Sequence, residues 1–195
     1  LEAEFNGQRF SIQRIGTNND LLHAEDLLLK WNKRADVLCI SGVKHPSSVG
    51  SKRIQPTQTR KLLQMCKRLH TLVATGETLY NVSQEWSIRN IQFQHGNNYF
   101  NNANVFFFSG LENGTLARVM SEYTQNLMFA DPVIVDNVPK VLNSMKELSF
   151  YADKAHGLLK QIPVGKMMNA GKKIQSVNTY QLNRALNKAN IVVIP

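Results

Sequence analysis

The sequence lacks the features that place many chains in a class at once. It has only two cysteines, Cys39 and Cys66, with no Cys-x-x-Cys pair and no His/Cys cluster. This excludes a disulfide framework and gives no spacing typical of a zinc site, so no metal is expected. No stretch approaches the roughly 18 consecutive apolar residues of a transmembrane helix. We therefore expect a cytoplasmic protein, without membrane contact, in which both cysteines are reduced and mostly buried.

Acidic residues are missing from one long stretch. None occurs between Asp36 and Glu77. The same stretch holds seven basic residues: Lys44, Lys52, Arg53, Arg60, Lys61, Lys67 and Arg68. Together with a formal net charge of +9, this pattern favours anionic partners.

Motifs of nucleotide binding and of hydrolysis are also absent. The sequence contains neither G-x-x-x-x-G-K-[ST] nor G-x-G-x-x-G, and it has no G-x-S-x-G elbow. No Ser/His/Asp or Cys/His arrangement can be recognised. The sequence therefore leaves the catalytic residues unknown, and it does not establish that the protein is an enzyme.

Three short apolar runs are what the sequence does offer. They begin at Val37, Leu72 and Val105, and each ends in a hydroxyl residue followed by glycine. The three dipeptides, Ser41-Gly42, Thr75-Gly76 and Ser109-Gly110, are 34 residues apart in both intervals. This is about the length of one βαβ unit, and such runs are typical of buried parallel strands. The pattern predicts a three-layer α/β fold with a mainly parallel, Rossmann-like sheet and with all three glycines on its carboxyl edge.

The remaining segments fit one α/β domain over residues 1–195. Asn6-Gly7 between alternating segments predicts an N-terminal β-hairpin within residues 1–16. The apolar spacing predicts the following further elements: helices over 20–34, 57–69, 78–89, 139–156 and 179–189, an irregular helical segment over 157–171, and a last strand over 191–194. An ending on a strand is compatible with a piece of a longer chain.

The predicted carboxyl edge is where open α/β sheets bind ligands. The long polar loop over 42–56 supplies glycines, hydroxyls and cations, which together bind phosphate or carboxylate. The candidate ligand-binding residues are Ser41, Gly42, Lys44, Lys52, Arg53, Thr75, Gly76, Ser109 and Gly110. A solvated basic loop is the alternative for this segment. Glu77 and Glu112 are candidates for acid–base roles, although carboxylates at helix starts also serve the helix dipole.

The N-terminal part resembles a known group of sequences. The stretch Arg9-Phe-Ser-Ile-Gln-Arg-Ile-Gly-Thr-Asn, a following helix, and Ala35-Asp-Val-Leu-Cys-Ile-Ser-Gly-Val are similar to the start of an uncharacterised bacterial family labelled quinate/shikimate dehydrogenase-like. The similarity lies mainly within residues 8–45. It implies a nicotinamide cofactor, NAD(P), and dehydrogenase chemistry.

Three functional hypotheses follow. The first is a ligand-binding or enzymatic domain that binds a small anionic or phosphorylated ligand at the carboxyl edge. The second is an NAD(P)-dependent dehydrogenase-like domain. The third is a non-catalytic interaction domain that binds nucleic acid through the basic helix over 57–69, which we rank last because that helix lacks stacking aromatics. The oligomeric state is not indicated.

Overall fold

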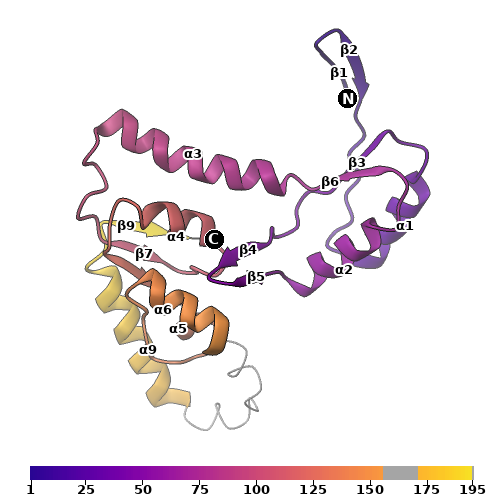
Figure 1. The fold of residues 1–195 in the computed structure, drawn as a ribbon. Coiled ribbons are helices and arrows are strands. Elements are labelled where there is room, and N and C mark those ends of the chain that lie inside the picture. Colours follow the sequence, from indigo (N-terminus) through magenta and orange to yellow (C-terminus); the bar gives the residue numbers. More distant parts are fainter. Residues whose placement is uncertain (156–170, 195) are drawn as a thin grey trace. The chain divides into compact units, whose positions relative to one another are not determined.

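The computed structural model describes residues 1–155 and 171–194, and its fold is mixed α/β (Figure 1). Whereas the sequence suggested one domain, these residues form two compact units. Unit 1 consists of Leu1–Val43 and Thr57–Thr75. Unit 2 consists of Lys44–Pro56 and Gly76–Pro195.

Unit 1 begins with two paired strands. β1 (Glu2–Phe5) and β2 (Gln8–Ser11) pair antiparallel. Asn6 and Gly7 between them have φ values of 50° and 75°, which a two-residue hairpin turn requires of both its central residues. Every residue of both strands is exposed.

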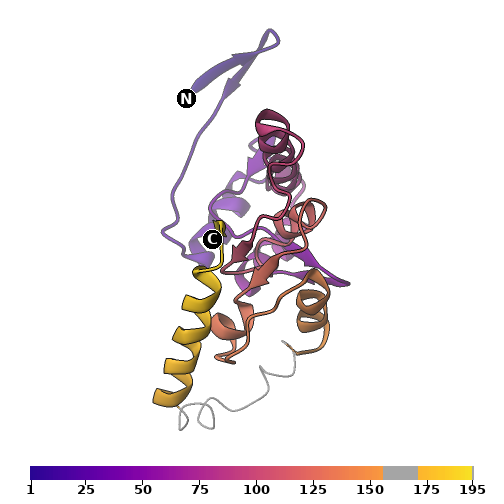
Figure 2. The same cartoon turned by 90° about the vertical axis from the view of Figure 1, so that its left-hand side faces the viewer.

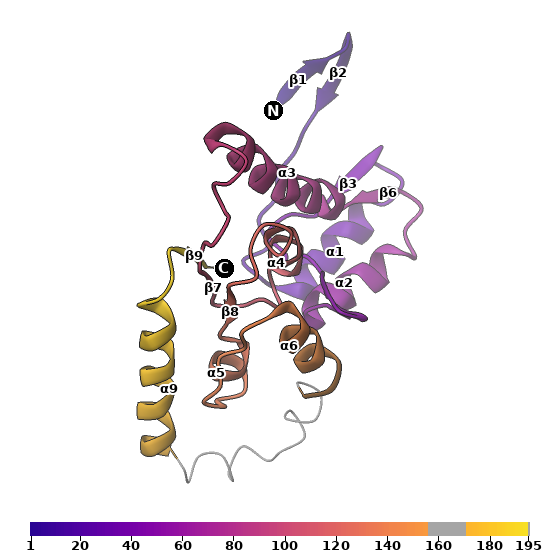
Figure 3. The ribbon, with the colours of Figure 1, turned by 60° about the vertical axis from the view of Figure 1, so that its left-hand side comes forward.

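The rest of unit 1 is a small parallel sheet covered by two helices. It contains α1 (Leu21–Trp31), β3 (Val37–Cys39), α2 (Thr57–Cys66) and β6 (Leu72–Ala74), with β3 and β6 paired parallel. Leu38 and Val73 pack with Leu28, Leu62 and Cys66 of the helices. Figure 3 shows α1 and α2 side by side.

One prediction about the cysteines is confirmed and one is wrong. Cys66 is buried in the core of unit 1, but Cys39 is exposed. Only one face of the β3–β6 sheet is covered, and alternate residues of a strand point to opposite faces. The outer face therefore carries Cys39 together with Val37 and Leu72, which are 46% and 69% exposed. Apolar composition alone predicted burial on both faces.

Unit 2 is built around a three-stranded parallel sheet whose central strand is fully buried. Its strand order is β8 (Leu127–Phe129), β7 (Val105–Phe107), β9 (Ile191–Val193). The helices are α3 (Glu77–His95), α4 (Gly114–Met120), α5 (Asp131–Val135), α6 (Met145–Phe150), the π-helix η1 (Tyr151–Ala155) and α9 (Gly171–Leu186). One core contains Phe107, Phe129 and Leu148. A second core, containing Phe106 and Ala185, packs α9 against the sheet, and α9 leads directly into β9 (Figure 2).

The prediction of one sheet with three glycines on one edge is wrong. Gly42 follows β3 in a two-stranded sheet of unit 1, whereas Gly110 follows β7 in the three-stranded sheet of unit 2. Strand pairing in the described residues gives four small sheets. Equal spacing along the sequence did not reveal which strands would pair, because pairing depends on contacts distant in the chain.

Other boundaries also differ from the sequence-based expectations. The loop over 42–56 contains a hairpin of β4 (Ser47–Val49) and β5 (Lys52–Ile54). The helix expected from Pro139 begins at Met145, because the Ser144 side chain caps it by accepting from the Glu147 amide. The irregular segment expected over 157–171 falls almost wholly outside the described residues. Among the described residues, no helix has the length and apolar character to cross a bilayer.

Candidate functional site

The nine predicted ligand-binding residues are divided between the two units. Ser41, Gly42 and Thr75 belong to unit 1, where they follow the neighbouring strands β3 and β6. The Ile40 amide donates to the Ala74 carbonyl at 2.9 Å, which extends this pairing toward the carboxyl ends. Lys44, Lys52, Arg53, Gly76, Ser109 and Gly110 belong to unit 2.

The turn after β7 holds an anion that belongs to the protein itself. The carboxylate of Asp131 accepts hydrogen bonds from the Ser109 hydroxyl at 3.0 Å, the Gly110 amide at 2.8 Å and the Leu111 amide at 2.9 Å. Asp131 follows β8, the parallel neighbour of β7, and is 0% exposed. Hydroxyl and amide donors therefore converge where we predicted, but a buried side chain already occupies them.

Burial and hydrogen bonding act in opposite directions on this carboxylate. Burial raises the pKa of Asp131, and the amides of Leu111 and Gly110 and the Ser109 hydroxyl lower it, with a net pKa above the ordinary value. The glycine of the turn is required by packing. A Cβ at Gly110 would lie 2.4 Å from Cδ1 of Phe129, so a larger residue would force the core apart.

Two of the three cations in the predicted loop are paired with carboxylates. Lys44 Nζ lies 2.8 Å from Glu112 Oε1, and Arg53 Nη2 lies 2.7 Å from Glu77 Oε1. These are the two carboxylates that the sequence suggested for acid–base roles. The Ser51 hydroxyl also donates to Asp153 at 2.9 Å. The loop is therefore held by its own acidic neighbours.

The β4–β5 hairpin is also docked on α4. The Gly114 amide donates to Ser47 Oγ at 3.0 Å, and a Cβ at Gly114 would lie 2.4 Å from the Ser48 carbonyl oxygen. Val49 of the hairpin is 2% exposed. This segment is a packed structural element, although the sequence suggested an open binding loop.

In the described ranges, the side-chain groups that bind metal ions and the position of a cavity also bear on the candidate site. No cluster of three or more His, Cys, Asp or Glu residues there could hold a metal ion. His45 stacks on Tyr80 with ring centroids 4.7 Å apart. A cavity of about 350 Å³ lies elsewhere in unit 2, lined mainly by residues of α5, α6 and the segment between them, and none of the nine predicted residues contributes to it.

Unit 1 carries exposed basic residues on α2 and on the turn that follows it. We call the side formed by Arg60, Lys61, Gln64, Lys67 and Arg68 the basic face; all five residues are exposed. Leu62 and Cys66 on the opposite side are buried. Within residues 1–155 and 171–194, none of the four cations makes an ion pair.

Hydrogen bonds join the end of α2 to the end of α1. Asn32 Oδ1 accepts from the amides of His70 at 2.9 Å and Thr71 at 3.1 Å. The Lys33 amide donates to Thr71 Oγ1 at 2.7 Å. These contacts bring the basic end of α1, with Lys30, Lys33 and Arg34, beside the end of the basic face. The cations at the end of α1 also make no ion pair within the part that the structure describes.

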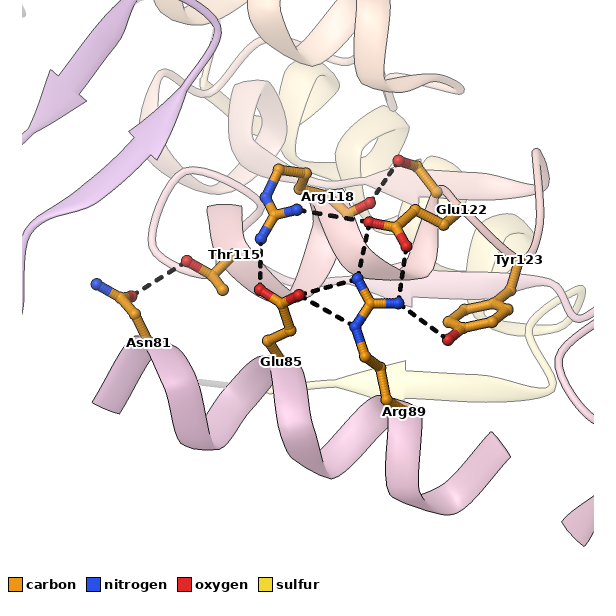
Figure 4. A network of polar contacts seen from close by, with 8 residues as sticks. Asn81, Glu85, Arg89, Thr115, Arg118, Glu122 and Tyr123 are labelled. Carbon is orange, nitrogen blue, oxygen red and sulfur yellow. Dashed lines mark hydrogen bonds and ion pairs between the residues drawn. The ribbon is translucent and has the colours of Figure 1, made fainter. Parts of the chain in front are cut away.

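A third polar feature joins α3 to α4 (Figure 4). Arg89 pairs with Glu85 at 2.9 Å and with Glu122 at 2.9 Å, and Arg118 pairs with Glu85 at 2.9 Å. The Thr115 hydroxyl donates to Asn81 at 3.1 Å. The hydrogen bonds from Arg89 and Arg118 lower the pKa of Glu85. These polar groups of α3 thus face α4 and the residues after it, and Ile88 of the same helix packs against the core of unit 2.

Sequence reasoning missed two of these arrangements. Asp131 had a detectable signal, because it comes directly after a short apolar run and sits at a helix start. No signal in the sequence could have shown which cations are ion-paired, because partners such as Lys44 and Glu112 are far apart in the sequence.

Comparisons with known proteins give two family matches. Residues 1–73 match the family described as Domain of unknown function (DUF8753), and residues 78–195 match Domain of unknown function (DUF8754). Residues 74–77 between the two matches include Thr75 and Gly76, where the chain passes from unit 1 to unit 2, although Lys44–Pro56 within the first match belongs to unit 2. No curated protein and no solved structure matches the chain. Neither family description names an activity, so the dehydrogenase-like resemblance stays a prediction. Because residues 78–195 are more than half of its length, the chain belongs to the family of Domain of unknown function DUF8754.

Proposed function

We propose that this protein is a non-catalytic nucleic-acid-binding protein that contacts the phosphate backbone of a duplex through the basic face of α2. The observation that supports this most is the set of four exposed cations on one side of the helix and its following turn without an ion pair among the described residues. Such cations can neutralise phosphates and release condensed counterions, which drives binding of this kind.

The basic face has the size and support that a backbone contact needs. Arg60 to Arg68 spans about 12 Å along a helix axis at 1.5 Å per residue. The buried side of α2 packs through Leu62 and Cys66 against Leu28 of α1. The cations are therefore presented from a fixed helix, with Lys30, Lys33 and Arg34 beside its end.

The composition of the face favours duplex over single strands. Proteins that bind single strands stack bases on aromatic side chains, and the basic face contains no aromatic residue. Contacts from Lys and Arg to phosphates position a protein on a duplex without reading its sequence. We therefore expect binding with little sequence preference.

An anionic membrane is the main competing surface. A helix that lies in a membrane buries its apolar side in the lipid. The apolar side of α2 already forms the core of unit 1. The basic face can therefore bind a membrane only by electrostatic attraction to its surface. A rigid duplex with closely spaced phosphates is the better partner for such an attraction.

The small-ligand and NAD(P) hypotheses have less support from the geometry. The donors at Ser109 and Gly110 bind Asp131, and Lys44 and Arg53 pair with carboxylates. A small anion at that edge would have to displace these partners.

The test is a salt titration of duplex binding, followed by fluorescence anisotropy of a labelled duplex between about 50 and 200 mM salt. For four phosphates neutralised, the slope of log K against log salt is expected near −3.6, since each phosphate contributes about −0.9. The variant Arg60→Gln/Lys61→Gln/Lys67→Gln/Arg68→Gln should lose most of this slope and keep the wild-type melting temperature. Binding unchanged in the variant, or anionic vesicles bound more tightly than the duplex, would refute the proposal.

A further inference from the structure

Helix α3 exposes apolar side chains in a regular pattern. We call Leu79, Val82, Trp86 and Phe93 the α3 stripe; they are 73%, 58%, 63% and 82% exposed. Their spacing of three, four and seven residues places them on one side of the helix, as in the seam of a coiled coil. A helix at a protein surface normally turns its apolar side toward the core.

The orientation of α3 is fixed by its polar side. Glu85 and Arg89 pair with Arg118 and Glu122 of α4 and the residues after it (Figure 4). Near the end of the helix, Gln92 is buried and accepts from the Phe100 amide at 3.1 Å. The helix is thus held by these polar contacts and by Ile88, which packs against the core of unit 2, and the stripe is turned away from α4.

We propose that the α3 stripe is a homodimer interface, in which α3 of a second copy packs antiparallel around Trp86. Two members of the stripe are placed symmetrically about this residue, whereas Val82, four positions before it, has Asn90 as its counterpart four positions after it. Leu79 lies seven positions before Trp86 and Phe93 lies seven positions after it. In an antiparallel pair, Leu79 of one copy meets Phe93 of the other and the two Trp86 side chains meet at the twofold axis, as a self-complementary interface requires.

The area and the charge of the stripe also fit a second copy. With roughly 150–250 Å² for each large side chain, the four exposed fractions leave about 500 Å² of apolar surface per copy. Two copies would bury about 1,000 Å², which reaches the lower bound of specific interfaces. The residues along one border, Ser83, Asn90 and Gln94, are uncharged, and Glu85 and Arg89 on the other are already paired. A second copy therefore meets no unpaired like charge along the stripe.

The test measures the mass of the whole chain by sedimentation over a range of concentrations. We expect a reversible change from one copy to two. Trp86→Glu, which puts a charge at the twofold axis, should weaken dimerisation by about 100-fold or more, because a central Trp is removed from both copies. The matched control Ser87→Glu adds the same charge one position away, off the stripe, and should still dimerise.

Two further readouts keep the proposal falsifiable. In a Cys39→Ser background, Leu79→Cys of one copy should cross-link with Phe93→Cys of another, whereas Leu79→Cys alone should not cross-link with itself. Added salt should strengthen dimerisation, since it screens the repulsion between two chains of net charge +9. The same salt should weaken duplex binding, so a failure of one proposal can be distinguished from a failure of the other. A wild-type protein that stays monomeric, equal dimerisation of Trp86→Glu and Ser87→Glu, or self-cross-linking of Leu79→Cys would overturn the interface.

Discussion

Within one continuous acid-free stretch of sequence, two cations of unit 2 are ion-paired and the four cations of the basic face in unit 1 are not, among the residues that the structure describes. In unit 2, Lys44 and Arg53 pair with Glu112 and Glu77. In unit 1, the four cations of the basic face pair with no carboxylate of the described residues. From composition alone, the loop cations and the basic-face cations were both expected to contact an anionic partner. The difference shows that a basic segment is available for an anionic ligand only where the fold brings no acidic side chain to it.

The turn after β7 extends this comparison from cations to hydrogen-bond donors. Ser109, Gly110 and Leu111 supply the donors of an anion site, and Asp131 satisfies them from inside the fold. Unit 2 thus uses its turn donors and two of its loop cations, Lys44 and Arg53, in contacts within the unit. Unit 1 keeps its cations exposed to solvent.

The largest expected effect comes from removing the internal anion. Asp131→Ala leaves three donors without an acceptor in the core of unit 2. Each buried unpaired donor has a penalty of about 1–3 kcal/mol, so we expect the free energy of unfolding to fall by roughly 3–5 kcal/mol. Chemical denaturation followed by circular dichroism measures it. A loss below that of the exposed-pair variant Glu112→Ala would show that the Ser109 turn does not depend on Asp131.

The next effect tests how closely the β4–β5 hairpin approaches α4. In Gly114→Ala the new Cβ would lie 2.4 Å from the Ser48 carbonyl oxygen, a backbone atom that cannot rotate away. Overpacking of this kind destabilises by about 1–3 kcal/mol. The control is Gly16→Ala, because no atom lies within 4 Å of a Cβ there. Equal melting temperatures of the two variants would mean that the hairpin does not dock.

A smaller effect should appear in the pH dependence of stability. The pKa of Asp131 is raised in the folded state, while in the unfolded chain it is about 3.9. Between these two values the native state holds the extra proton, so the free energy of unfolding falls as the pH rises through this window. Asp131→Asn removes this contribution. Unfolding curves measured from pH 3 upward should therefore show a steeper decline in the wild type than in the variant; parallel declines would contradict the raised pKa.

The smallest effect concerns the exposed ion pairs. Lys44 and Glu112 have side chains that are 65% and 43% exposed. Exposed pairs contribute about 0–1 kcal/mol. A double-mutant cycle of Lys44→Gln and Glu112→Gln should therefore give a coupling within this range, decreasing in high salt. A coupling of several kcal/mol, or one that salt leaves unchanged, would mean that the pair is desolvated.

Local patterns in the sequence predicted the elements but not their assembly. The runs at Val37, Leu72 and Val105 are strands. A helix is the next element after β6 and after β7, whereas the β4–β5 hairpin separates β3 from α2. Which strands pair was not predictable, because β7 pairs with β8 and β9 through contacts that no local pattern encodes. Burial was overestimated at Cys39 for the same reason: an apolar run does not show whether one face or both are covered.

The hydrogen-bond donors expected at Ser109 and Gly110 are present, and ligand binding at the candidate residues stays a prediction. Ser109 and Gly110 do present donors to a carboxylate, as the hydroxyl–glycine pattern suggested. The carboxylate is Asp131, 22 residues from Ser109 in the sequence, and spacing gives no rule for such a partner. The basic face of α2 was visible in the sequence, but only the structure shows that its charges lack the carboxylates found at the loop.

The most direct measurement compares two double variants that remove the same kinds of charge from the two units. Lys67→Gln/Arg68→Gln removes one lysine and one arginine from the basic face of unit 1, and Lys44→Gln/Arg53→Gln removes one of each from the paired loop of unit 2. In the salt titration of duplex binding, the first should reduce the slope by about 2, near 1 for each phosphate that the variant no longer neutralises, and the second should leave it near the wild-type value. An equal reduction by both variants, or a larger one from the loop of unit 2, would contradict the account.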